Sequence, residues 1–224
     1  MSGTARCDGI ADWYDTEFQP APLESETWDV LLRLLGDGGG SLVDVGCGTG
    51  AYAAGLAERG WEVTGVDVSD DMLRRATAKG VHAVHADASA LPFAEASFDA
   101  AISVFTSTDV DDLPAVVREI VRVLRPGAPL VYLSVHPCFV GPHSLYDSET
   151  GVPELHAGWY RHVGRYTEAP GVWRESGVRI RVGATHLPLG LFLQTFLDAG
   201  LRLEQVEEPS EREYPFGLGL RWRR

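Results

Sequence analysis

The stretch that decides the fold reads Leu42-Val43-Asp44-Val45-Gly46-Cys47-Gly48-Thr49-Gly50. Its apolar residues predict a buried strand over residues 41–45, and its glycines predict a sharp turn into a helix. Glycines let the backbone turn tightly and approach a ligand closely, while the first amides of the helix face that ligand. We therefore expect a ligand-binding turn at the carboxyl end of a strand.

Two ligand classes use such a turn, and these residues match both. Gly46, Gly48 and Ala51 satisfy the dinucleotide pattern G-x-G-x-x-A. Asp44, however, stands two residues before the first glycine. A carboxylate there is awkward beside a pyrophosphate and suits a ligand that carries an ammonium and a sulfonium. Gly50 completes the spacing D-x-G-x-G-x-G, which favours the second ligand class.

Outward from the turn, strand patterns alternate with helix patterns along the chain. Strands that alternate with helices predict a parallel α/β sheet with helices on both faces, and its ligand edge lies at the carboxyl ends of the strands. The expected strands are residues 41–45, 61–66, 81–86, 98–104, 130–135, 201–206 and 218–222. The expected helices are residues 10–18, 24–35, 51–59, 70–79, 112–124 and 189–199.

With these features the chain resembles the class I S-adenosylmethionine-dependent methyltransferases, in their small-molecule branch. The resemblance implies a Rossmann-like fold with a mostly parallel seven-stranded sheet, helices on both faces and a cap insertion after the fifth strand. It also implies S-adenosyl-L-methionine as the cofactor and S-adenosyl-L-homocysteine as the by-product. The expected parts are N-terminal helices that close over the site, the cofactor-binding core, the substrate cap, and a C-terminal helix with strands, which are residues 1–40, 41–135, 136–188 and 189–224.

The resemblance assigns the glycine turn to the methionine part of the cofactor. Gly46, Cys47, Gly48 and Gly50 would line that part, and Asp44 would support its amino group. The alternative is a glycine turn that holds no cofactor.

Asp67, at the end of the second expected strand, is the candidate ribose ligand. An acidic residue about 20 positions beyond the loop commonly takes ribose hydroxyls, and a carboxylate accepts both hydrogen bonds of a diol. A helix cap is the alternative, but Ser69 and Asp70 already serve as caps. Val68 and Met72 would flank the adenine.

The resemblance places the rest of the cofactor after the third and fourth strands. Asp87 and Ala88 match the positions that meet the adenine amino group and a ring nitrogen, and Ser103 would lie beside the cofactor. Tyr14 would close over the cofactor from the N-terminal helix, where a surface aromatic is the alternative. Trp13, Tyr14 and Phe105 would also face the acceptor.

The stretch 136–188 breaks the alternation and is the expected seat of substrate choice. It is rich in aromatic and histidine residues, which suit a closed small-molecule pocket, although most of them can simply form the core of the insertion. Within it, the alternation of residues 178–182 predicts a strand with one wet face. The substrate-binding candidates are His136, His143, Tyr146 and Trp159.

His136 and His186 are the candidate proton acceptors. His136 follows the fifth strand directly, and His186 precedes the last core helix in a segment where family members often have His-Arg; Leu187 departs from that pattern. An imidazole titrates near neutrality and could take a proton from the acceptor as the methyl arrives. In the competing interpretation both histidines only orient the acceptor or the backbone, and alignment supplies the acceleration.

Charge and composition argue against several classes of partner. The formal net charge of −13 is unfavourable for binding a nucleic-acid backbone or an anionic membrane. The fourth strand also lacks the Asn/Asp-Pro-Pro-aromatic motif of the methyltransferases that act on exocyclic amines of nucleic acids. The chain contains no stretch of 18 apolar residues, so no membrane span is expected, and residues 1–10 do not resemble a signal peptide. We expect a monomer or a homodimer.

The cysteines and the aspartate cluster give no metal site. Cys7, Cys47 and Cys138 have neither metal-ligand nor disulfide spacing, so a cytoplasmic location is expected. Asp109, Asp111 and Asp112 are interpreted as helix caps rather than magnesium ligands.

The expected function is methyl transfer to oxygen or nitrogen of a small molecule, with secondary metabolism as the expected setting. Three alternatives stay open at this point. The chain could bind the cofactor but catalyse a non-methylating cyclisation or elimination, it could be a nicotinamide-dependent oxidoreductase, or it could be a non-catalytic cofactor-binding subunit.

Overall fold

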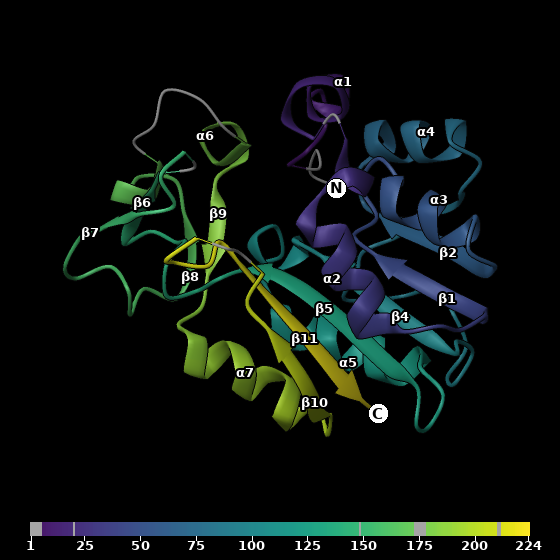
Figure 1. Ribbon diagram of the computed structural model, residues 1–224. Coiled ribbons are helices and arrows are strands. Elements are labelled where there is room, and N and C mark those ends of the chain that lie inside the picture. Colours follow the sequence, from purple (N-terminus) through teal and green to yellow (C-terminus); the bar gives the residue numbers. More distant parts are fainter. Residues whose placement is uncertain (1–5, 20, 148, 173–177, 210–211) are drawn as a thin grey trace.

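A seven-stranded sheet forms the centre of the protein, with strand order β10-β11-β5-β4-β1-β2-β3 (Figure 1). In this computed structural model six strands of the sheet run in the same direction, and β11 runs opposite to them, pairing antiparallel with both β5 and β10. The expected class I fold is therefore confirmed. The structure describes residues 6–19, 21–147, 149–172, 178–209 and 212–224.

The elements of the core follow the expected alternation. The strands of the sheet are β1 (Gly40–Val45), β2 (Trp61–Asp67), β3 (His82–His85), β4 (Ala100–Val104), β5 (Pro129–Val135), β10 (Arg202–Glu207) and β11 (Gly217–Arg223). The longer helices are α2 (Glu26–Leu35), α3 (Ala51–Ala57), α4 (Asp70–Ala78), α5 (Leu113–Val123) and α7 (Leu189–Asp198). Short helical turns are α1 (Ala11–Trp13), η1 (Tyr14–Phe18), η2 (Pro22–Glu24), η3 (Thr106–Thr108), η4 (Pro170–Val172) and α6 (Val178–Val182).

Two apolar cores pack on the two faces of the sheet. On one face, α2 and α3 cover Leu42, Ile102 and Leu133, and α4 packs beside α3. On the other face, α5 and α7 cover a larger cluster that includes Tyr132 and Trp222, both fully buried. Strand residues therefore alternate between the two cores, as expected for a sheet that is buried on both faces.

Helix caps and one side-chain bridge fix the ends of these elements. Ser69 caps α4 and Asp112 caps α5 by accepting a backbone N–H from the first turn. Asp99, just before β4, accepts hydrogen bonds from the amide and hydroxyl groups of Ser41, at 2.9 and 2.8 Å. Its hydrogen bond with Arg125 is the main cause that lowers the pKa of Asp99 to about 2. Asp99 thus ties the start of β1 to the start of β4.

The insertion after β5 forms two small antiparallel sheets beside the main one. β6 (Ser144–Tyr146) pairs with β7 (Pro153–Leu155), and β8 (Gly164–Tyr166) pairs with β9 (Ala184–His186). The prediction of a strand over residues 178–182 is wrong, because this segment is the short helix α6. Gly183 donates its amide to the carbonyl of Arg179 at 2.8 Å, as one turn of helix requires.

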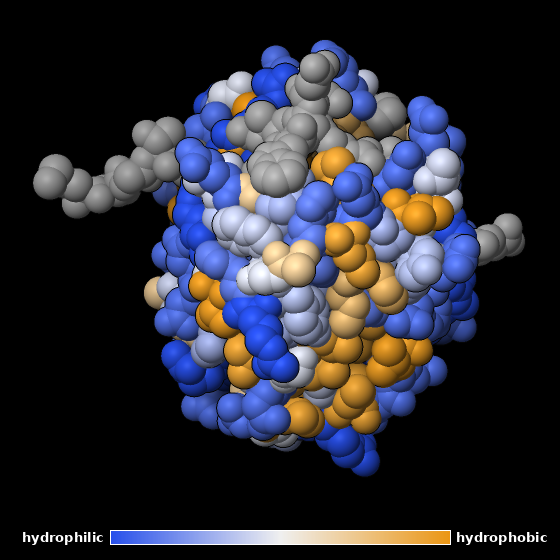
Figure 2. Space-filling model, turned by 90° about the vertical axis from the view of Figure 1, so that its left-hand side faces the viewer, coloured by the Kyte–Doolittle hydropathy of each residue, from blue (hydrophilic) through white to orange (hydrophobic). Residues whose placement is uncertain are grey.

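The outer face on the α7 side carries exposed apolar side chains. Figure 2 shows them gathered in the lower half of this face, at the height of α7 and β10 in Figure 1. Exposed apolar residues of these two elements include Leu191, Leu197 and Val206. None of the helices in the described ranges is long and apolar enough to cross a membrane.

Candidate active site

A cavity of about 620 Å³ lies at the carboxyl ends of the parallel strands. Its walls include residues that directly follow β1, β2, β3 and β4, so it lies on the edge where β1 separates β2 from β4. Ligands of open α/β sheets bind at such a point of reversed strand order. The N-terminal segment and α6 cover the cavity from outside.

The glycine turn forms one wall of the cavity. Gly46 and Gly48 line it, with φ of +76° and +52°. A Cβ at position 46 would come within 2.5 Å of the Thr106 hydroxyl, whereas a Cβ at position 48 would meet nothing within 4 Å. Position 48 therefore leaves open space in front of the turn, and position 46 permits close packing behind it.

The other two turn residues support the backbone from outside the cavity. Cys47 is buried in the small core between α3 and α4, and burial raises the pKa of its thiol. Gly50 has a φ of +76°, and a Cβ there would come within 2.7 Å of Ala76. Both residues hold the shape of the turn, so any contact they make to a ligand is through the backbone.

Asp67 joins the ends of β1 and β2 inside the cavity. One carboxylate oxygen accepts the Gly48 amide and the other accepts the Ser69 amide, each at 2.9 Å. Burial raises the pKa of Asp67 and these amides work against that rise. Because each carboxylate oxygen has a second lone pair, Asp67 can still accept two hydroxyl groups.

Asp44 is the second carboxylate near the glycine turn; it lies in β1, is 2% exposed, and is not among the residues that line the cavity. Among the described residues its carboxylate has no hydrogen-bond partner. Burial, and then the charge of Asp67, raises the pKa of Asp44 to about 7. A buried carboxylate without a donor is costly, so this group fits a ligand that brings a cation.

The adenine candidates lie together along the cavity. Val68, Met72, Asp87 and Ala88 all line it. Met72 is buried in the first turn of α4, and Asp87 accepts the Ser89 amide and hydroxyl at 2.8 and 2.7 Å. Ser103 instead lies fully buried in β4 and donates its hydroxyl to the Val45 carbonyl, so its side chain braces β1 against β4.

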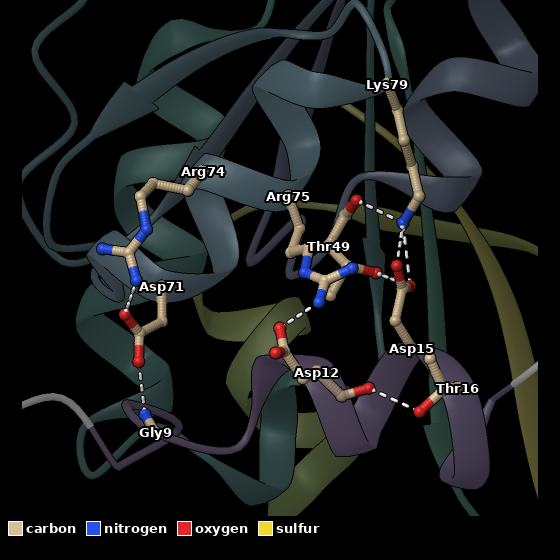
Figure 3. Close-up of polar contacts among 9 residues, drawn as sticks. All are labelled: Gly9, Asp12, Asp15, Thr16, Thr49, Asp71, Arg74, Arg75 and Lys79. Carbon is tan, nitrogen blue, oxygen red and sulfur yellow. Dashed lines mark hydrogen bonds and ion pairs between the residues drawn. The ribbon is translucent and has the colours of Figure 1, made fainter.

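The N-terminal segment covers the cavity and contacts α4 and the glycine turn (Figure 3). Asp15 accepts the Thr49 hydroxyl at 2.7 Å and pairs with Lys79 at 2.7 Å, and Lys79 also donates to the Thr49 carbonyl at 2.9 Å. Further along α4, Arg75 pairs with Asp12 and the Gly9 amide donates to Asp71. These contacts hold Tyr14 over the cavity, and burial raises the pKa of its phenol.

Several cavity residues were not predicted from the sequence. Arg6 and Arg179 line it and pair with Asp111 and Asp109 of the loop before α5, the latter pair at 3.1 Å. Phe216, which precedes β11, packs edge-on against the predicted residue Phe105 at 6.4 Å between ring centroids. The helix-cap interpretation holds for Asp112, whereas Asp109 and Asp111 pair with arginines instead.

His136 and His186 lie outside this cavity. His136 is 3% exposed; its Nδ1 accepts the Cys138 amide and its Nε2 contacts Glu208 at 2.9 Å. His186 is 4% exposed and donates from Nε2 to the Tyr160 carbonyl, and burial is the main cause that lowers its pKa to about 4. Among the described residues no histidine lines the cavity, so this geometry does not support a histidine as proton acceptor.

The other substrate candidates form the structure around the cavity. His143 packs between Tyr160 and His186, and burial lowers its pKa. Tyr146 donates its hydroxyl to the Tyr214 carbonyl at 2.7 Å. Trp159 packs against the small core of the insertion, and Trp13 lies under the guanidinium of Arg181 at 4.3 Å.

Within the described ranges no cluster of three or more acidic, cysteine or histidine side chains has the form of a metal site.

Comparison with known proteins shows the same core in methyltransferases. A family model described as "Methyltransferase domain" matches residues 43–132. A malonyl-[acyl-carrier protein] O-methyltransferase of Salmonella typhimurium is 31% identical over 224 aligned positions; the alignment covers 90% of this chain and 88% of that protein.

Two further likenesses extend this result. A malonyl-[acyl-carrier protein] O-methyltransferase of Pseudescherichia vulneris is 34% identical over 152 residues, or 66% of this chain, and the chain spans only 55% of its length. The crystal structure of an S-adenosylmethionine-dependent methyltransferase from Mesorhizobium loti has a TM-score of 0.74 at 26% identity, over 90% of this chain and 99% of that chain. The glycine turn, the carboxylates around it and these likenesses show that the chain belongs to the class I S-adenosylmethionine-dependent methyltransferases.

Proposed function

We propose that the main cavity binds S-adenosylmethionine and a small-molecule acceptor and that the chain methylates an oxygen of that acceptor. The observation that carries the proposal is the pair of carboxylates at the glycine turn. Asp67 has two free lone pairs for a ribose diol, and Asp44 is buried without a donor where an ammonium group is needed.

In this assignment the cofactor lies along the strand ends. Its methionine part lies over Gly46 and Gly48, and its adenine lies between Val68, Met72 and the loop of Asp87. Ala88 supplies backbone groups to the ring, while Cys47, Gly50 and Ser103 support the site from behind. When bound, the cofactor supplies a methyl group on a sulfonium, which passes to the acceptor in one in-line displacement.

The remaining part of the cavity is proposed to hold the acceptor. Phe105 and Phe216 give it an apolar wall, and the Asp109–Arg179 ion pair gives it a polar one. Trp13, Tyr146, Trp159 and His143 hold the covering segments in place, so they act on the acceptor indirectly. Closure by the N-terminal segment and the insertion of residues 136–188 would exclude water and align the reactants.

The choice of oxygen as the acceptor atom is based on the relatives, and the choice of a small-molecule acceptor is based on the net charge of the chain. The two relatives compared above are named O-methyltransferases, which supports methyl transfer over cyclisation, elimination, hydride transfer or a non-catalytic role. The net charge of −13 supports a small molecule over a nucleic acid or an anionic membrane. Three free cysteines support a reducing compartment such as the cytoplasm, and a secondary metabolite is a suitable acceptor.

Transfer of a labelled methyl group tests this proposal. The protein is incubated with methyl-labelled S-adenosylmethionine and, separately, with carboxylic acids, phenols and primary amines, and the products are separated by mass. Label in an ester or ether supports the proposal, and label only in amines moves the acceptor atom to nitrogen. Cofactor binding without transfer to any of the three classes would refute it, and tight NADH binding would favour the oxidoreductase alternative.

A further inference from the structure

Strand β11 presents glycines to the face of the sheet that α2 covers. In Gly217-Leu218-Gly219-Leu220 both leucines pack into the core on the α5 and α7 face, so the glycines face α2. A Cβ on Gly219 would lie 2.9 Å from Val30 and from Leu34, and a side chain there would push the helix away. Glycine at this position is thus required by close packing.

Gly217 lies two residues earlier, where α2 begins, and its neighbours are less close than those of Gly219. A Cβ there would lie 3.1 Å from the Pro209 ring and 3.7 Å from the Ser134 carbonyl, and its φ is not in the left-handed region. The backbone conformation therefore does not demand glycine at this position, and a small side chain needs only a shift of the Pro209 ring by a few tenths of an ångström. What the missing side chain leaves is space.

That space is a second cavity, of about 200 Å³. Its walls combine apolar residues, among them Val30, Leu133 and Leu218, with polar ones, among them Glu26 and Arg212. The main cavity and the second cavity share three lining residues, Thr27, Phe105 and Phe216. The two cavities therefore adjoin each other at the Phe105–Phe216 ring pair.

The backbone fixes Phe105 at this junction. Its φ of +59° is left-handed, a conformation that only one other non-glycine residue, Ala96, shares among the described residues. The Phe105 amide donates to the Leu133 carbonyl at 2.8 Å, which holds the turn against the end of β5. Strained backbone of this kind persists where the surrounding structure holds it in place.

We propose that the second cavity binds a ring-sized part of the methyl acceptor, while the nucleophilic oxygen of the same molecule lies in the main cavity. A cavity of about 150 Å³ is enough to hold benzene, so a space of about 200 Å³ takes one six-membered ring. Gly217 is the specificity-determining residue, because any side chain at this position shortens the site. This inference rests on the proposed function, since it divides the acceptor between two cavities.

Binding of fluorobenzene to the protein saturated with S-adenosylhomocysteine tests the proposal by fluorine NMR. Wild type is expected to bind the probe. Gly217→Val places a side chain in the second cavity and is expected to weaken probe binding at least about tenfold. The affinity of Gly217→Ala is expected to lie between those of wild type and Gly217→Val. Gly190→Val makes the same change on α7, where a Cβ meets nothing within 4 Å, and is expected to bind as wild type does.

Three outcomes overturn the subsite. They are a wild type that binds no probe, a Gly217→Val protein that binds it as tightly as wild type, and a Gly190→Val protein that loses it equally. If Gly217→Val fails to fold, as loss of S-adenosylhomocysteine binding would show, the Gly217→Ala titration decides. Failure of wild type to bind S-adenosylhomocysteine contradicts the proposed function instead, so the two failures are distinguishable.

Discussion

At the residue scale, two carboxylates around one glycine turn have opposite environments. Asp67 accepts two backbone amides, whereas Asp44 has no donor among the described residues and has a pKa raised to about 7 by burial and by Asp67. A site that binds a cation gains affinity from such a group, and the free protein loses stability because of it. The role of Asp44 should therefore affect the stability of the free protein as well as the affinity for the ligand.

Replacing Asp44 by Asn should change how stability depends on pH. The pKa of Asp44 in the folded protein is above the ordinary value of 3.8, so the folded state keeps this proton to higher pH than the unfolded state does. The stability that the protonated group contributes is present at low pH and is lost as pH rises toward 7. Between pH 5.5 and 8.5 the ligand-free wild type should lose about 2 kcal/mol of unfolding free energy relative to Asp44→Asn. Urea unfolding at both pH values measures this, and parallel pH profiles would contradict it.

At the element scale, the N-terminal segment is held to the cofactor edge mainly by charge. Asp15 contacts both Lys79 of the α4 end and Thr49 of the glycine turn, so the cover and the turn share one set of contacts (Figure 3). Burial alone would raise the pKa of Asp15, but the hydrogen bonds from Lys79 and Thr49 outweigh it and the pKa falls below its usual value. Ordering of this segment is thus coupled to the turn beneath it.

Replacing Lys79 by Met should speed the release of S-adenosylhomocysteine. A partly exposed ion pair contributes about 0.5–1 kcal/mol, which corresponds to roughly a two- to fivefold faster dissociation rate. Salt screens such pairs, so the difference from wild type should shrink at high ionic strength. Stopped-flow displacement measures the rate. Arg202→Met, which removes an exposed ion pair within β10, away from the N-terminal segment, is the control and should release the ligand as wild type does.

The insertion should be the acid-sensitive element of the chain. The pKa of His186 is lowered to about 4, mainly by burial, and its ring lies 5.5 Å from that of His143, whose pKa is also lowered. A histidine that is neutral in the folded state favours folding above its unfolded pKa of about 6.5, and this contribution is lost as pH falls toward 4.

His186→Gln should therefore reduce the loss of stability between pH 7.5 and 5 by about 1–2 kcal/mol. Thermal unfolding across this range measures the effect, with His82→Gln on the exposed end of β3 as the control. A wild type and a His186→Gln protein with the same pH slope would show that the buried imidazole does not govern acid sensitivity.

At the scale of the whole molecule, the core could be predicted because each element carries its own local pattern. Strands β1, β4 and β5 carry short apolar runs, and glycines such as Gly60 and Gly80 follow the ends of helices. The strand predicted over residues 178–182 is wrong because period-two spacing over five residues also places Val178 and Val182 on one helical turn. The partners of its arginines, Asp109 and Trp13, are distant in sequence.

The residues of the candidate site likewise divide into those with a local sequence signal and those without one. Gly46, Asp67 and Asp87 line the cavity because each lies at or just after the carboxyl end of a strand, and these ends lie at one edge of the sheet. The direction that a long insertion takes has no such local signal, so His136 and His186 could be proposed beside the cofactor although they lie outside the cavity. The walls supplied by Arg6, Arg179 and Phe216 form only when distant segments fold together, and no local pattern marks them.

The central claim is that this edge binds S-adenosylmethionine through Asp67, and titration calorimetry with S-adenosylhomocysteine tests it most directly. Wild type should bind the ligand, and Asp67→Ala should bind it at least about 10- to 150-fold more weakly, because each of the two charge-assisted hydrogen bonds to the diol contributes roughly 1.5–3 kcal/mol. The comparison is made on protein shown to be folded by its thermal unfolding. Unchanged affinity in folded Asp67→Ala, or no binding to wild type, would contradict the account.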